Sequence, residues 1–318
     1  MDELYVGIDI GTGSVRSYVF DKSGNVISYD TKELEIKRPS LYEAEQDPEE
    51  IIRKFKEALI NSVRKLSEDR KENVRGISIS SQLHGMTAID GNGKPLVPLI
   101  IWMDRRSKDI ISLVEEKMDD ETIYSKTGCR LNTMYPLAKI FWMREKKPEL
   151  FKRVDKFFVS AKDYIVYKMF DEFSTDYSVA SGSSLLNVKE LSWDGEILSL
   201  LELDEEKLPE LRSCYGYLGP LPKNICEQIG IKGEVPVYFG ASDASLSNVG
   251  LGALMGKVAV NVGTSGAIRT VSDKPLLDGF GRTFCYLLDE KNWLVGGAIT
   301  VSYTHLRAHE TPEHLVCR

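Results

Sequence analysis

The residues near the start of the chain that are best suited to chemistry lie in one short stretch. Residues 7–14 read Gly-Ile-Asp-Ile-Gly-Thr-Gly-Ser, an alternating strand that ends in a turn of glycines and hydroxyls. Such glycines expose backbone N–H groups that can surround phosphate oxygens. The carboxylate of Asp9 can hold Mg²⁺ through a water molecule. An ordinary glycine-rich hairpin would have the same pattern, so this stretch alone leaves both interpretations open.

A second stretch repeats this pattern. Residues 257–262 and 267–271 predict strands on either side of the turn Gly263-Thr264-Ser265-Gly266. The first turn likewise leads into a strand at residues 15–20, whereas a Rossmann turn or a P-loop leads into a helix, which disfavours an oxidoreductase. Two related domains could close such turns around the β- and γ-phosphates of one nucleotide. The hydroxyl donors would be Thr12, Ser14, Thr264 and Ser265.

Asp243 is the candidate catalytic carboxylate. It follows the predicted strand at residues 235–240 and could take a proton from an attacking hydroxyl. Phosphoryl transfer depends mainly on positioning and charge stabilisation, so an aspartate with an ordinary pKa of about 3.9 is adequate. The alternative is that Asp243 caps a helix that begins at residue 244.

Further candidates for substrate contacts follow two predicted strands. His84, beside Gln82 in a loop, could hydrogen-bond a polyol hydroxyl or a carboxylate, or it could be incidental. Trp102 could stack on a sugar or belong to the core. Asp104 and Arg106 could bind substrate or form a local ion pair.

The surrounding pattern predicts an α/β protein that positions these residues. Asp47 and Pro48 predict a helix start, and apolar residues at helical spacing over 51–66 predict a helix that faces the core. Residues 74–81 predict the strand before the His84 loop, and residues 90–93 predict a hairpin turn. Further helices are expected at the segments 107–118, 136–145 and 162–170.

Bulk composition narrows the classes of protein. The chain has 318 residues, 42% apolar and 28% charged, and a formal net charge of −7. We expect two globular domains, no nucleic-acid partner and no membrane association. Five scattered cysteines without a Cys-x-x-Cys pair, and a start without a signal peptide, predict a cytoplasmic protein with free thiols. A homodimer is compatible with these properties.

Five motifs in a fixed order carry a family resemblance. They occupy residues 7–12, 82–85, 102–106, 240–243 and 263–266. With residues 134–143, they make the chain resemble the FGGY family of carbohydrate kinases over residues 4 to about 300. The resemblance implies the actin-like, ribonuclease H-like ATPase fold, with ATP and Mg²⁺ as cofactors.

The resemblance also implies roles for particular residues. Asp243 would be the general base, and Asp9 would help to hold Mg²⁺. The nucleotide phosphates would lie against Gly11, Thr12, Gly13, Ser14, Arg16, Gly263, Thr264 and Ser265. The sugar would lie against Gln82, Leu83, His84, Trp102, Asp104 and Asp243.

The substrate indications differ along the chain. Residues 45–50, 174–178, 263–270 and 284–286 look most like gluconate kinases, whereas residues 82–85 are closer to xylulose kinases. We therefore expect a gluconate kinase that forms 6-phosphogluconate, with xylulose kinase or another FGGY sugar kinase as the alternative. A non-enzymatic, actin-like nucleotide switch is the alternative from another class.

The resemblance ends after residue 299. We expect a sugar-binding domain at residues 1–242, part of the nucleotide domain at 243–300, and a read-through tail at 301–318 that holds three of the four histidines. A zinc site in the tail is disfavoured, because His309 and His314 are five residues apart with a proline between them. A partial second domain predicts exposed apolar strand edges, weak ATP binding and little kinase activity.

Overall fold

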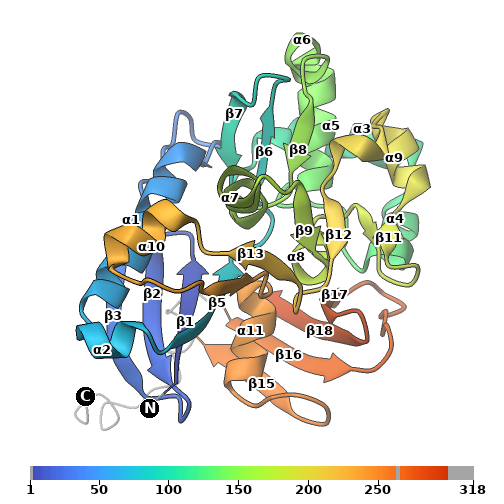
Figure 1. Ribbon diagram of the computed structural model, residues 1–318. Helices are drawn as coiled ribbons and strands as arrows, with labels where there is room; N and C mark the ends of the chain where they lie inside the picture. Colours follow the sequence, from blue (N-terminus) through green and yellow to red (C-terminus); the bar gives the residue numbers. More distant parts are fainter. Residues whose placement is uncertain (1–2, 263–265, 300–318) are drawn as a thin grey trace, which may run out of the picture.

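The computed structural model describes residues 3–262 and 266–299 and shows an α/β protein (Figure 1). The predicted tail and the turn residues 263–265 lie outside the described residues. Among the helices described, none has a stretch that is both long and apolar enough to cross a bilayer.

The largest sheet carries the first glycine turn. Its strands, in spatial order, are β13 (Tyr217–Pro220), β14 (Pro236–Tyr238), β5 (Val74–Ser81), β1 (Leu4–Ile10), β2 (Ser14–Asp21) and β3 (Val26–Glu33). β1 is antiparallel to β2 and parallel to β5, so Asp9 has Arg16 on one side and Ser80 on the other. The apolar residues of β1 alternate as predicted, and Leu4, Ile8 and Ile10 are buried in the core.

One long helix covers part of this sheet. α1 (Pro48–Arg64) packs on β2 and β3 and contacts α10 (Lys223–Ile229). Asp47 caps it by accepting a hydrogen bond from the Glu49 N–H, and Pro48 occupies its first turn. The predicted helix start is therefore confirmed. The short helix α2 (Glu68–Lys71) leads into β5.

A smaller sheet and most of the helices form the middle of the chain. The sheet order is β4 (Glu45–Gln46), β7 (Pro95–Ile100), β6 (Met86–Ile89) and β8 (Lys156–Phe158). The helices are η1 (Arg106–Ile110), α3 (Ile111–Lys117), α4 (Asp120–Thr127), α5 (Pro136–Lys146), α6 (Pro148–Phe151), α7 (Ala161–Phe170), α8 (Tyr177–Ser181), α9 (Gly195–Leu201) and η2 (Glu205–Lys207). Two short pairs, β9 (Ser174–Asp176) with β12 (Glu210–Arg212) and β10 (Leu186–Asn187) with β11 (Ser192–Trp193), complete it.

The last described part is a four-stranded antiparallel sheet with one helix. Its strand order is β15 (Val258–Val262), β16 (Gly266–Ser272), β18 (Asn292–Ile299) and β17 (Phe284–Asp289). α11 (Asp243–Gly250) links it to the largest sheet and lies between the two in Figure 1. β15 and β16 are the strands predicted around the second glycine turn.

The predicted domain boundary at 242/243 falls between β14 and α11. The two sides of that boundary share a core, because buried residues of β17 and β18 pack in one cluster with those of the middle part. The division into two domains stays a prediction.

Exposed apolar residues lie on the last sheet. Val258, Val260, Val262 and Ile268 are all exposed on β15 and β16. The sequence predicted uncovered apolar strand edges here, and the structure has an uncovered apolar face.

Candidate active site

A cleft of about 350 Å³ brings together most of the predicted substrate residues. Its walls include Gln82, Leu83 and His84 after β5, Trp102 after β7, and Asp243 at the start of α11. This volume is typical of sites for small ligands. Gln82 and Asp243, which are 161 positions apart in the sequence, therefore line the same cleft, as expected from the sequence.

His84 is a neutral hydrogen-bonding group at this cleft. Burial, with a smaller contribution from the charge of Lys139, lowers its pKa to about 3. Its Nδ1 lies 2.6 Å from the carbonyl oxygen of Gly182. A carbonyl only accepts, so Nδ1 carries the proton and Nε2 is left as an acceptor. The ring therefore suits a sugar hydroxyl; it has no free N–H for a carboxylate.

The backbone around His84 is held in a sparsely populated conformation. Its φ is +66°, which few non-glycine residues adopt. The ammonium group of Lys139, buried in α5, donates to the carbonyl oxygens of His84, Ile100 and Ile101. The ring also meets Tyr135 edge-on, with centroids 4.9 Å apart. His84 is therefore fixed in position at the cleft, and its contact with a sugar stays a prediction.

Trp102 and Thr12 connect the cleft to the first glycine turn. Trp102 is 42% exposed, so the alternative of a core tryptophan is wrong. Its Nε1 donates to the Thr12 hydroxyl at 2.9 Å, and that hydroxyl donates to Gln82 Oε1 at 2.8 Å. Gln82 Nε2 donates to Gln46 Oε1, and Gln46 Nε2 donates to the Thr12 carbonyl, which closes a ring of hydrogen bonds. The Thr12 hydroxyl, predicted to face phosphate, is therefore engaged by Trp102 and Gln82, two of the predicted sugar contacts.

The other residues of the first turn lie beside the cleft without lining it. Ser14 is buried and accepts a hydrogen bond from Arg16 Nε at 3.1 Å. Gly11 donates its N–H to the Ser14 carbonyl, and a side chain at Gly13 would have open space around it. The predicted phosphate contacts of these residues stay predictions, and those of Gly263, Thr264 and Ser265 lie outside the described residues.

Asp9 is placed to hold a hydrated cation. Its Oδ1 accepts from the Ser80 hydroxyl at 2.9 Å, and its Oδ2 lies 3.8 Å from Arg16 Nη1. The side chain of Asp9 is about one-third exposed, so its carboxylate is accessible to solvent. No group of three or more metal-ligating side chains occurs in residues 3–262 and 266–299. A lone carboxylate with open space fits a magnesium ion that keeps most of its water.

Asp243 is the first residue of α11, and Ser242 is its cap. The Ser242 hydroxyl accepts from the Ser245 N–H, so the alternative that Asp243 caps the helix is wrong. Asp243 is exposed at the cleft. The protein packed around it, with a smaller contribution from the charge of Asp9, raises its pKa to about 6. Gly240 precedes this segment with φ +66°, and a side chain there would overlap the Ile79 carbonyl.

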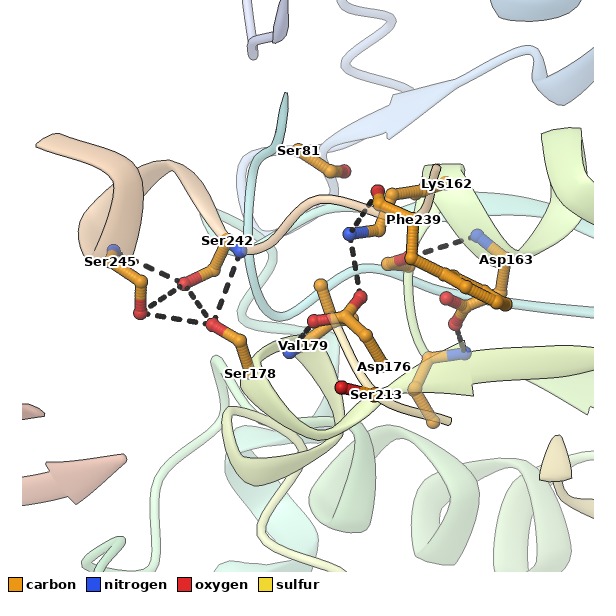
Figure 2. A network of polar contacts seen from close by, with 12 residues as sticks. Ser81, Lys162, Asp163, Asp176, Ser178, Val179, Ser213, Phe239, Ser242 and Ser245 are labelled. Carbon is orange, nitrogen blue, oxygen red and sulfur yellow. Dashed lines mark hydrogen bonds and ion pairs between the residues drawn. The ribbon is translucent and has the colours of Figure 1, made fainter. Parts of the chain in front are cut away.

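A buried polar network fixes the segment that carries Asp243 (Figure 2). The hydroxyls of Ser178, Ser242 and Ser245 lie 2.9–3.0 Å from one another. Beside them, Lys162 Nζ lies 2.6 Å from Asp176 Oδ2 and 3.4 Å from the Phe239 carbonyl. These contacts attach both ends of the segment 239–245 to α7 and α8.

Asp104 requires a correction. Its carboxylate is buried and accepts from Arg106 at 2.8–3.0 Å and from the Ala44 N–H at 2.7 Å. Arg106 also pairs with Glu45 at 2.6 Å. The local ion pair is confirmed, and Asp104 does not line the cleft, because its oxygens are occupied inside the protein.

Sequence reasoning missed several residues that line the cleft. Tyr135 and Tyr286 both line the cleft, and their hydroxyl groups are hydrogen-bonded to each other at 3.0 Å. Three arginines also line it: Arg130, Arg269 and Arg282. Tyr135, Arg269 and Tyr286 lie inside stretches that carried the family resemblance, but strand and helix patterns did not indicate which way their side chains point.

Comparison with known proteins assigns this fold and site to a class. A sequence model of the N-terminal domain of the FGGY family of carbohydrate kinases matches residues 4–250, and the chain belongs to this family. The predicted resemblance and the actin-like fold class are thereby confirmed.

Individual relatives are similar over nearly the whole chain. The gluconokinase of Bacillus subtilis (strain 168) is 37% identical over 301 residues, and the xylulose kinase of Escherichia coli (strain K12) is 29% identical over 294. These matches cover 94% and 91% of this chain, but only 58% and 59% of the relatives' length.

Solved structures are similar to the same extent. A gluconate kinase and a ligand-bound xylulose kinase from Lactobacillus acidophilus each superpose with a TM-score of 0.91, at 29% and 30% identity. Both matches cover 99% of this chain and 65% of the other.

Proposed function

We propose that the protein transfers the γ-phosphoryl group of ATP to a hydroxyl of a sugar acid, with gluconate as the substrate and 6-phosphogluconate as the product. The observation that carries this is the cleft itself. Asp243 faces the same space as His84, Gln82 and Trp102, and the latter two are hydrogen-bonded to the first glycine turn.

Each group of the cleft would have a distinct task. His84 Nε2 would accept a hydrogen bond from a sugar hydroxyl, and Trp102 would cover one side of the carbon chain. Asp243 would take the proton of the attacking hydroxyl as that oxygen bonds to the γ-phosphorus and the bond to the leaving ADP oxygen breaks. A pKa of about 6 leaves this carboxylate ionised at neutral pH, yet more basic than an ordinary aspartate.

The cofactors would lie on the other side of Thr12. Asp9 would hold Mg²⁺ through water, and residues 12–14, with Arg16, would face the phosphates. When bound, the metal ion supplies positive charge that offsets the charge developing on the phosphoryl oxygens.

Gluconate is favoured over D-xylulose by the comparisons. Two Bacillus gluconokinases are 36–37% identical to this chain, and the xylulose kinases compared with it are 27–30% identical. Xylulose kinase remains the second candidate because the motif at residues 82–85 resembles that branch. We also propose a cytoplasmic location, because Cys129, Cys214, Cys226 and Cys285 are buried free thiols.

The test measures ADP release with gluconate, D-xylulose, glycerol and L-ribulose, together with sugar binding by calorimetry. We expect gluconate to stimulate ADP release most. Asp243→Ala should abolish transfer and leave sugar binding mostly intact, and turnover retained by this variant would remove Asp243 from the role of base. ADP release that no sugar stimulates, without sugar binding, would favour a nucleotide switch.

A further inference from the structure

The walls of the cleft carry more positive than negative charge. Arg130, Arg269 and Arg282 line it, with Asp243 as the one lining carboxylate among the described residues. This is unusual in a chain whose formal net charge is −7. The cleft is therefore better suited to an anionic ligand than most of the protein surface.

Two of the three guanidinium groups already have an acidic partner. Arg130 Nη2 lies 2.6 Å from Asp120 Oδ2. Arg282 makes two hydrogen bonds of 2.9 Å to the carboxylate of Asp278 and lies over the ring of Phe280. Their charges are largely compensated within the protein, and both side chains are well exposed to solvent.

Arg269 differs from both. Its Nε and Nη1 atoms are buried, and neither has a hydrogen-bond partner among the described residues. A buried guanidinium nitrogen without an acceptor is costly, so such groups are normally paired in the functional state of a protein. Arg269 lines the cleft and, unlike Arg130 and Arg282, forms no ion pair among the described residues, so its charge is available to an anion that enters the cleft.

The fold makes room for this side chain. Arg269 on β16 lies opposite Gly296 on β18, and a Cβ on Gly296 would come within 3.1 Å of Arg269 Cγ. The stem of Arg269 therefore passes over a glycine of the next strand. The charge of Arg269 also acts on two other residues that line the cleft. Desolvation by the surrounding protein raises the pKa of Asp243 and Tyr286, and the charge of Arg269 partly offsets this rise.

We propose that Arg269 binds the carboxylate of the sugar acid and thereby selects acids over neutral sugars. This rests on the proposed function, which it deepens by naming the residue that reads the acid group. His84 cannot serve instead, because it is neutral with its one N–H on Gly182. Arg269 and Asp243 line the same cleft, and in this proposal the carboxylate of gluconate meets the first while its terminal hydroxyl meets the second.

A guanidinium can also bind a phosphoryl group, so an experiment must distinguish the carboxylate of the sugar acid from the phosphoryl group as the anion that Arg269 binds. We commit to the carboxylate because the cleft that Arg269 lines is formed by the sugar-side residues and not by the first glycine turn. The probes are gluconate and D-glucitol, which share one carbon chain and differ in that glucitol has a hydroxymethyl group in place of the carboxylate.

Calorimetric binding without nucleotide gives the first readout. We expect Arg269→Gln to weaken gluconate binding about 10- to 100-fold, the range for hydrogen bonds to a charged group, and to change glucitol binding less than about twofold. Arg282→Gln should weaken gluconate binding much less, because that guanidinium is already paired. Arg153→Gln, which lies outside the cleft, is the control for the substitution itself.

Several outcomes would overturn the proposal. Equal losses for both ligands would show a structural role, and an unchanged gluconate affinity in Arg269→Gln would exclude the contact. Turnover that falls equally with gluconate and D-xylulose, at unchanged gluconate affinity, would assign Arg269 to the phosphoryl group. If gluconate binds but Arg269→Gln has no effect, only this inference fails; if the unaltered protein does not bind gluconate, the proposed substrate fails with it.

Discussion

Replacing Lys162 with methionine would leave the carboxylate of Asp176 buried without its ionic partner. Both side chains are 0% exposed, and their closest atoms are 2.6 Å apart. Removing one member of a buried pair typically costs about 3–5 kcal/mol of unfolding free energy. The contact is close but is not aligned as a hydrogen bond. We therefore expect a loss near the lower end, about 3 kcal/mol.

A double substitution distinguishes the lost pairing from lost packing. Asp176 also caps α8 by accepting from the Val179 N–H, and asparagine can keep that contact. Lys162→Met combined with Asp176→Asn should therefore recover most of the loss and end within about 1 kcal/mol of the unaltered protein. Both side chains would then be uncharged and of similar volume.

Urea denaturation followed by circular dichroism measures these differences. Lys152→Met is the matched control, because Lys152 pairs with Glu149 on the surface and should cost less than about 0.5 kcal/mol. A loss below about 1 kcal/mol for Lys162→Met would refute the reasoning, since a buried unpaired carboxylate cannot be that inexpensive. A double variant as unstable as the single one would also refute it, because the cost would then be due to packing.

Three further predictions concern the site and the last sheet. Turnover should fall as pH drops through about 6, because the raised pKa leaves Asp243 protonated below that value, and a pH–rate profile flat down to pH 5 would contradict this. Gly240→Ala should lower the unfolding free energy by about 2–3 kcal/mol, whereas Gly24→Ala, also at positive φ but in open space, should cost about 1 kcal/mol by the same denaturation assay. Val260→Lys should reduce self-association and binding of a hydrophobic dye, because Val260 lies on the exposed apolar face; unchanged light scattering and fluorescence would argue against that face as the cause.

Sequence patterns that act over a few residues correctly predicted the strands and helices that depend on them. The alternation in residues 4–10 gave β1, and Asp47 with Pro48 gave the start of α1, because strand alternation and helix capping act over a few residues. The cleft residues Gln82, His84 and Asp243 follow predicted strands, but the sequence pattern left their roles open, and the family resemblance selected them as site residues.

Long-range polar contacts could not be predicted in the same way. The partner of Lys162 lies 14 positions away, on β9, and the Phe239 carbonyl lies 77 positions away. From its residue type alone, a lysine is expected at the surface, because buried lysines are rare. Asp104 was included among the substrate residues for a similar reason: its type suits a ligand contact, and only the fold reveals that Arg106 and Ala44 occupy it.

Arg269 shows why the strand pattern was misleading in the last sheet. Adjacent residues of a strand face opposite sides, and the usual assignment places the apolar residue inward and the charged residue toward solvent. In β16, Arg269 instead has buried guanidinium atoms at the cleft, and Ile268 is 58% exposed on the apolar face that it shares with Val258, Val260 and Val262. Burying a guanidinium without an acceptor is energetically costly, and departures from local sequence rules are typical of functional sites. The inward position of Arg269 therefore supports the inference that an anion binds at this wall of the cleft.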